Sequence, residues 1–113
     1  MSSVNCSVHG SASGIHLTRA AAALLYGDRD EWAAGSRLVE LTLDDDGIEW
    51  LCFILESDGP TVVELGAVRD ADGNYRITDE DAAWAALDLM TATCHGCLTE
   101  MKQAQDDARN GRR

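Results

Sequence analysis

Apolar and polar positions follow two different periods along this chain, and the changes of period divide it into predicted elements. Between Leu17 and Leu25 the apolar residues recur at helical spacing, and Thr18 is the predicted N-cap. A second short helix is expected from Asp28, because Glu31 three residues later completes a pattern like a capping box. The sequence therefore predicts two short helices after its first fifteen residues.

A period of two replaces the helical period in the middle of the chain. Val39, Leu41 and Leu43 fall on one face of a predicted strand, and the following Asp44-Asp45-Asp46-Gly47 favours a turn. Residues 48–55 are apolar almost throughout, as in a central strand that is covered on both faces. The expected strands are 38–43, 48–55, 61–68 and 75–77. They predict an antiparallel β-meander of three to four strands.

The last expected element is one long helix that begins after Thr78. Acidic residues fill its first turn, where the helix dipole favours negative charge. A mostly apolar stripe continues at steps of three and four through Trp84, Leu87, Thr91, Cys94, Leu98 and Met101. The predicted fold is α+β, with the meander packed against the two short N-terminal helices and this long C-terminal helix. Residues 1–15 are expected to form an irregular tail, 16–109 a single domain and 110–113 a frayed C-terminus.

Two pairs of metal-binding residue types lie near opposite ends of the sequence. Cys6 and His9 form a Cys-x-x-His pair, and Cys94 and Cys97 form a Cys-x-x-Cys pair. A separation of three residues lets both members of a pair bind the same ion. Three thiolates and one imidazole would make a closed tetrahedral site for zinc. If the pairs meet in space, zinc would join the N-terminal segment to the C-terminal helix.

The same cysteines have other interpretations. Cys94 falls on the apolar stripe, where a free thiol acts as a small hydrophobic residue, and Cys52 is expected to do so inside its strand. A redox-active dithiol of Cys94 and Cys97 is the third alternative. It needs a helix N-terminus to stabilise the thiolate, and the predicted helix begins too early for that unless it breaks near Thr93.

Three further residues bear on the zinc hypothesis. His95 should point away from the cysteines that flank it, because adjacent helical residues face different directions. His16 could replace His9 as a ligand. Gly96 costs about 1 kcal/mol relative to alanine inside a helix, so its presence suggests that a backbone amide approaches a thiolate there.

The charge balance is strongly acidic, with 20 carboxylates against 9 lysines and arginines and a net charge of -11. Such a field repels nucleic acids and anionic membranes and favours a basic protein partner. The expected contacts to that partner are the turn carboxylates Asp44, Asp45, Asp46, Asp70 and Asp72. Neither acidic turn has the ligand spacing of a complete calcium loop.

Catalytic patterns are weak in this sequence. The chain carries neither a glycine-rich phosphate loop nor a nucleophile elbow, so a non-enzymatic binding or regulatory role is favoured. An accessory protein of a phage or mobile element, such as an inhibitor of a nucleic-acid-binding protein, is compatible with the size and charge. Without a visible secretory signal or membrane span, a cytoplasmic location is expected. A homodimer that covers residues 48–55 is left open.

Overall fold

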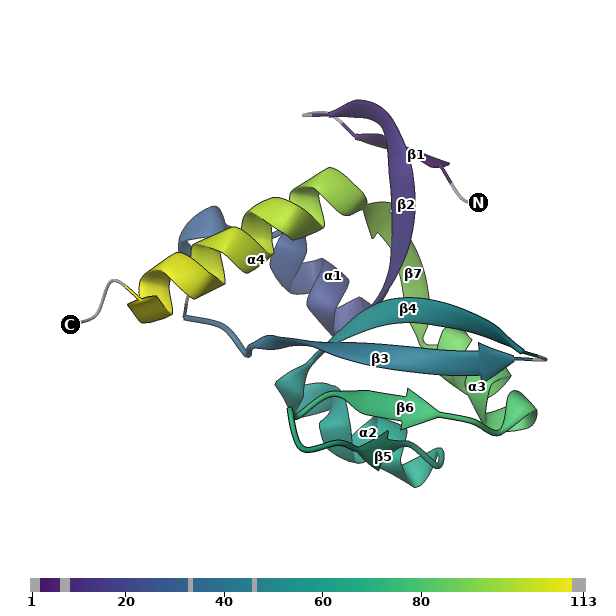
Figure 1. Ribbon diagram of the computed structural model, residues 1–113. Helices are drawn as coiled ribbons and strands as arrows, with labels where there is room; N and C mark the ends of the chain where they lie inside the picture. The colour runs from purple at the N-terminus through teal and green to yellow at the C-terminus, as the bar shows by residue number, and fades with distance from the viewer. Residues whose placement is uncertain (1–2, 7–8, 33, 46, 111–113) are drawn as a thin grey trace.

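The computed structural model describes residues 3–6, 9–32, 34–45 and 47–110 of the 113-residue chain (Figure 1). The strands are β1 (Ser3–Cys6), β2 (Gly10–Thr18), β3 (Leu38–Asp45), β4 (Ile48–Leu55), β5 (Val68–Arg69), β6 (Tyr75–Ile77) and β7 (Met90–Cys94). The α-helices are α1 (Arg19–Leu25), α2 (Gly59–Glu64), α3 (Glu80–Leu87) and α4 (His95–Asn110), and the 3-10 helices are η1 (Arg29–Glu31) and η2 (Glu56–Asp58). Within this part of the chain, no helix combines the length and the apolar character needed to cross a bilayer.

The six strands β2 to β7 form one mixed sheet in the order β7-β2-β4-β3-β6-β5. The pairs β2–β4 and β3–β6 are parallel, and the other neighbours in this order are antiparallel. Strand β1 pairs with the first half of β2 as a hairpin. The α+β class is therefore confirmed, whereas the predicted antiparallel meander is wrong.

The meander fails because the segment after β4 is helical. Residues 61–68 were predicted as a strand, but Pro60 lies in the first turn of α2, where its fixed φ and missing N–H favour a helix start. Val62 of α2 is fully buried, and only Val68 and Arg69 pair as strand β5. Helix α2 carries the chain across the sheet, so β6 returns parallel to β3, as crossover connections allow.

The long C-terminal helix is also wrong, because the chain breaks it into α3, β7 and α4. Thr91 and Thr93 are β-branched, which favours a strand, and the free edge of β2 supplies their partners. The Thr93 hydroxyl also donates a hydrogen bond of 3.0 Å to the carbonyl of Ile15. Trp84, which was assigned to the apolar stripe, is 54% exposed.

The N-terminal expectations are met in part. Helix α1 forms as predicted, and the Thr18 side chain accepts a hydrogen bond from the Ala21 amide as its N-cap. The second helix is only the single 3-10 turn η1, capped by Asp28. The described residues of the supposed irregular tail form strands β1 and β2, because cross-strand pairing overrides their low strand propensity. Residues 111–113 of the predicted frayed end lie outside the described residues.

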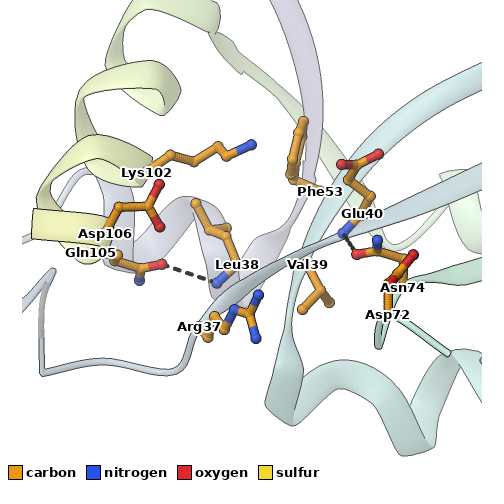
Figure 2. A pocket seen from close by; sticks show the side chains of 10 residues that line it. All are labelled: Arg37, Leu38, Val39, Glu40, Phe53, Asp72, Asn74, Lys102, Gln105 and Asp106. Atoms are coloured by element: carbon orange, nitrogen blue, oxygen red, sulfur yellow. Dashed lines mark hydrogen bonds between the residues drawn. The ribbon is translucent and has the colours of Figure 1, made fainter. Parts of the chain in front are cut away.

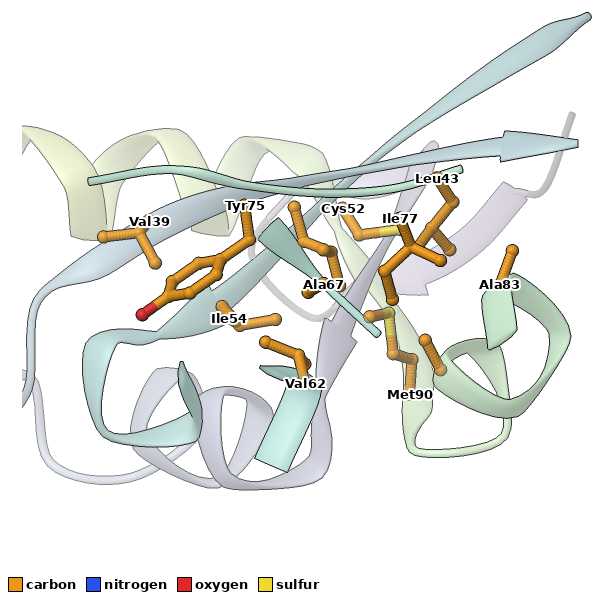
Figure 3. Packing of buried hydrophobic residues seen from close by; sticks show 12 residues of the cluster. Val39, Leu43, Cys52, Ile54, Val62, Ala67, Tyr75, Ile77, Ala83 and Met90 are labelled. Atoms are coloured by element: carbon orange, nitrogen blue, oxygen red, sulfur yellow. The ribbon is translucent and has the colours of Figure 1, made fainter. Parts of the chain in front are cut away.

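Two hydrophobic clusters cover opposite faces of the sheet. On one face, Leu41, Leu43 and Ile54 pack against α2 and α3 (Figure 3). On the other face, Leu17 and Phe53 pack against α1 and α4. The predicted alignment of Val39, Leu41 and Leu43 on one face of β3 is confirmed.

Gln105 joins α4 to the rest of the molecule through a buried side chain. Its Oε1 accepts a hydrogen bond of 3.1 Å from the Leu38 amide at the start of β3. Its Nε2 donates to the carbonyls of Trp32 and Ser36, each at 3.1 Å. The side chain therefore satisfies three backbone groups of the segment that leads into the sheet.

Replacing Gln105 with leucine should destabilise the protein by about 3 kcal/mol, because each buried polar group left without a partner costs about 1–3 kcal/mol. Urea denaturation would measure the free energy of unfolding. Gln103→Leu is the matched control, since Gln103 is exposed on the same helix and bonds only to Asp107 among the described residues. Equal stability of the Gln105 and Gln103 variants would contradict this role.

Candidate metal centre

The β1–β2 hairpin positions the first two candidate ligands. Cys6 is the last residue of β1 and pairs with Gly10, the first residue of β2. Gly10 has a φ of 70°, a left-handed conformation that glycine adopts without strain. His9 lies just before it, so the hairpin loop carries Cys6 and His9 together.

The junction of β7 and α4 positions the other two ligands. Cys94 is the last residue of β7 and pairs with Gly14 of β2, which places it beside the hairpin. Helix α4 begins at His95, so Cys97 lies in its first turn. Cys94 therefore directly precedes this helix of 16 residues, and both cysteines lie at its N-terminal end.

The four side chains converge on one point. His9 Nδ1 lies 3.5 Å from the sulfur atoms of Cys6, Cys94 and Cys97 alike, and the Cys6 and Cys97 sulfurs are 3.4 Å apart. All four ligand atoms lie within 4.8 Å of one another. In a tetrahedral zinc site, bond lengths of about 2.3 Å to sulfur and 2.0–2.1 Å to nitrogen give ligand separations of about 3.6–3.8 Å. The observed spacing suits this geometry.

The cluster raises the pKa values of two of the candidate ligands. Burial, followed by hydrogen bonds with Cys6 and Cys94, raises the pKa of the Cys97 thiol to about 12. Hydrogen bonds to Cys6 and then to Glu100 raise the pKa of His9 to about 9. A divalent ion would replace these protons, because thiolates and a neutral imidazole are its ligands.

The Glu100 carboxylate bonds to His9 Nε2, the ring nitrogen that is not close to the three sulfur atoms. Glu100 Oε2 lies 2.8 Å from His9 Nε2, and Glu100 Oε1 lies 2.9 Å from Arg29 Nη2. The bonds to His9 and then to Arg29 lower the pKa of Glu100. In the neutral ring with its proton on Nε2, Nε2–H would donate to this carboxylate and Nδ1 would direct its lone pair toward the three sulfurs, which is the tautomer that a metal requires.

Gly96 allows His9 to approach α4 closely. A Cβ atom at this position would lie 3.0–3.1 Å from three atoms of the His9 ring. The glycine thus makes room for the imidazole, whereas the sequence had suggested an amide approaching a thiolate.

The prediction that Cys6, His9, Cys94 and Cys97 come together is confirmed. Cys52 lies apart from them, fully buried in the sheet, where burial raises its pKa to about 12. His16 and His95 are outside the cluster, so His16 does not replace His9. Arg29 and Glu100 were missed, although Glu100 falls three residues after Cys97 on the same helical face.

The predicted partner contacts have local roles in the structure. Both carboxylate oxygens of Asp44 bond to Arg76 Nη1, at 2.8 and 2.9 Å. Asp70 Oδ1 accepts hydrogen bonds from the amides of Asp72 and Asn74, which shapes the turn between β5 and β6. Asp46 lies outside the described residues. A role of these carboxylates in binding a partner stays a prediction.

A polar cleft of about 380 Å3 lies between α4, the start of β3 and the turn before β6 (Figure 2). Lys102 extends across it, with Nζ 4.7 Å from the centre of the Phe53 ring. Glu40 and Asp106 also line it, so its walls carry both signs of charge. The cleft contains none of the four clustered ligands.

The Gly96→Ala substitution should weaken metal binding about tenfold, because the new methyl group displaces the His9 ring. The same substitution should raise the helix propensity of α4 by about 1 kcal/mol. Competition with a chromophoric chelator would measure the affinity. The exposed α4 residue Asp106 supplies the control, and Asp106→Ala should leave the affinity unchanged. An unchanged affinity in Gly96→Ala would show that the close approach is unimportant.

Replacing Glu100 with alanine should lower the metal affinity by about 10–100-fold, the usual effect of removing a partner of a ligating histidine. Glu100→Gln should lose less, because an amide oxygen can still accept from Nε2–H. Nitrogen NMR of His9 would report the tautomer in each variant. Glu64→Ala, at an exposed position on α2, is the control. Full affinity in Glu100→Ala would argue against this role.

No family model, curated protein or solved structure matches this chain. Its function is therefore inferred from the arrangement of its own residues. Among the described residues, the four-ligand cluster is the arrangement with the clearest chemistry, because sulfur and imidazole donors at these separations are the ligands of a known class of metal site.

Proposed function

We propose that this protein binds one zinc ion through Cys6, His9, Cys94 and Cys97, and that the ion fastens the N-terminal hairpin to helix α4. The equal distances of 3.5 Å from His9 Nδ1 to three sulfur atoms carry this proposal. A single ion bound to all four atoms would require similar separations between them.

The donor set favours zinc over other common ions. Three sulfurs and one imidazole nitrogen are soft or intermediate donors, whereas magnesium and calcium take oxygen ligands. Tetrahedral sites of sulfur and nitrogen are typical of zinc. Two chain segments far apart in sequence would supply the ligands, since Cys6 and Cys97 are 91 residues apart.

A structural role fits this site better than a catalytic one. Catalytic zinc sites use three protein ligands and keep the fourth position for water or substrate, whereas this cluster offers four protein ligands. A two-stranded hairpin such as β1–β2 is marginally stable by itself. Metal binding would stabilise its attachment to α4, because binding and folding are coupled at such sites.

A redox dithiol is the second candidate. The helix break before α4 supports it, because Cys94 and Cys97 lie at a helix N-terminus after all. The raised pKa of Cys97 opposes it, since a redox cysteine works as a thiolate near neutral pH. The zinc proposal also accounts for the position of His9 beside the sulfur atoms and for its bond to Glu100, whereas a redox dithiol requires neither residue.

Protein purified without chelator should contain one equivalent of zinc by elemental mass spectrometry. Single substitutions of serine for Cys6, Cys94 or Cys97, and His9→Ala, should each remove it. His95→Ala is the matched control, because this imidazole sits between two ligands yet lies outside the cluster. Cobalt replacement would test the geometry, since three thiolates and one nitrogen give a tetrahedral cobalt–thiolate spectrum.

The outcomes separate the two candidates even if a variant fails to fold. Wild-type protein that takes up neither zinc nor cobalt would exclude the metal site. A reversible Cys94–Cys97 disulfide in that protein, found by peptide mass mapping, would support the redox role. Zinc retained by the His9 variant with unchanged affinity would remove the imidazole from the ligand set.

A further inference from the structure

The β3–β4 hairpin extends beyond the rest of the sheet. The pairing of β6 with β3 ends at Leu43, and β2 pairs with β4 only at Cys52 and Phe53. Asp44 and Asp45 of β3 and residues 48–51 of β4 therefore form a two-stranded ribbon, and none of the described residues adds a third strand on either side. Figure 1 shows this end of β3 and β4 projecting past β6. We call these six residues the ribbon.

The β4 half of the ribbon exposes three large apolar side chains. Ile48 is 60%, Trp50 43% and Leu51 48% exposed, whereas the next four residues of the same strand are buried. Ile48 and Trp50 share a face with Cys52, and Leu51 lies on the opposite face with Phe53, because side chains alternate along a strand. Exposed apolar residues gathered in this way are typical of an interaction site.

Two acidic residues, Asp44 and Glu49, lie on the same ribbon as these apolar side chains. Arg76 Nη1 bonds to Asp44 and to Glu49 Oε2, the latter at 3.0 Å. Two carboxylates thus share one guanidinium, and in the sequence Asp45 and Asp46 directly follow Asp44, within a chain of net charge -11. The excess of negative charge repels a second copy of the ribbon, as charged residues on open strands usually do. It attracts a positively charged partner.

The backbone of the ribbon is also open to pairing. Along residues 48–51, the edge of β4 that faces away from β3 has no neighbouring strand among the described residues. An extended peptide can add to such an edge through main-chain hydrogen bonds while its side chains contact the neighbouring surface. Charge, apolar exposure and an open edge therefore coincide on one short segment.

We propose that the ribbon is the docking site for a positively charged, extended segment of a partner protein. The segment adds as a strand along residues 48–51 of β4. Its apolar side chains contact Trp50 and Ile48, and its lysine or arginine side chains pair with the ribbon's carboxylates. The ribbon shares no residue with the metal centre, so this proposal does not depend on the bound ion.

A synthetic peptide of alternating lysine and valine, blocked at both ends, is a suitable probe for the whole chain as purified. Its binding should shift the amide NMR signals of residues 48–51 and should weaken as salt is added, because exposed charges are screened. Trp50→Ser should weaken binding about tenfold, a loss typical of a buried aromatic anchor. Trp84→Ser is the matched control, since Trp84 is similarly exposed but lies on α3.

Two further peptides test the separate parts of the proposal. A glutamate–valine peptide should not bind, and a lysine–serine peptide should bind at least tenfold more weakly than the lysine–valine peptide. Signals that shift elsewhere on the surface, or equal binding by the lysine–serine peptide, would overturn the proposal. So would a concentration-dependent dimer whose interface maps to the ribbon, because a second copy would then be the occupant.

Discussion

The sulfur atoms of Cys6, Cys94 and Cys97 and the imidazole of His9 place four potential metal ligands within 4.8 Å of one another. Burial is the main cause that raises the pKa of Cys97 to about 12, and a divalent ion bound as proposed would displace that proton. At this cluster the N-terminal hairpin meets the first turn of α4. Farther along the helix, the buried Gln105 holds α4 against the start of β3. Helix α4 is thus fixed at two places along its length.

Much of the centre could be predicted from the sequence, because its signals are local. The Cys-x-x-His and Cys-x-x-Cys spacings identify the four ligands without any knowledge of the fold. Local signals also gave strands β3 and β4 and the Thr18 cap of α1. The residues that support the ligands were harder to find. Gly96 and Glu100 act on His9, which is far away in sequence, so no local pattern reveals their contacts.

The errors in the predicted fold arise where tertiary contacts override periodicity. The steps of three and four between Trp84 and Met101 predicted a continuous helix, yet Thr91 and Thr93 pair with β2 instead. Val62 and Val63 favoured a strand, but Pro60 starts a helix that crosses the sheet. Strand β2, which pairs with Thr91 and Thr93, and strand β3, which pairs with β6, both lie far from their partners in the sequence. The parallel pair β3–β6 follows from the helix at Pro60, and the parallel pair β2–β4 arises because the expected irregular tail forms β2, so the antiparallel meander could not be corrected from local patterns.

The separation of the ligands along the chain has a consequence for biosynthesis. Cys6 and His9 leave the ribosome long before Cys94 and Cys97 are made, so the four-ligand centre cannot assemble until the intervening chain has been translated. Until then the emerging hairpin would offer an ion only half of the proposed ligands. Closing so long a loop has an entropic cost that grows only slowly with length. Under the zinc proposal, attachment of the hairpin to α4 is thus a late step in folding, and it would depend on the supply of metal at that moment.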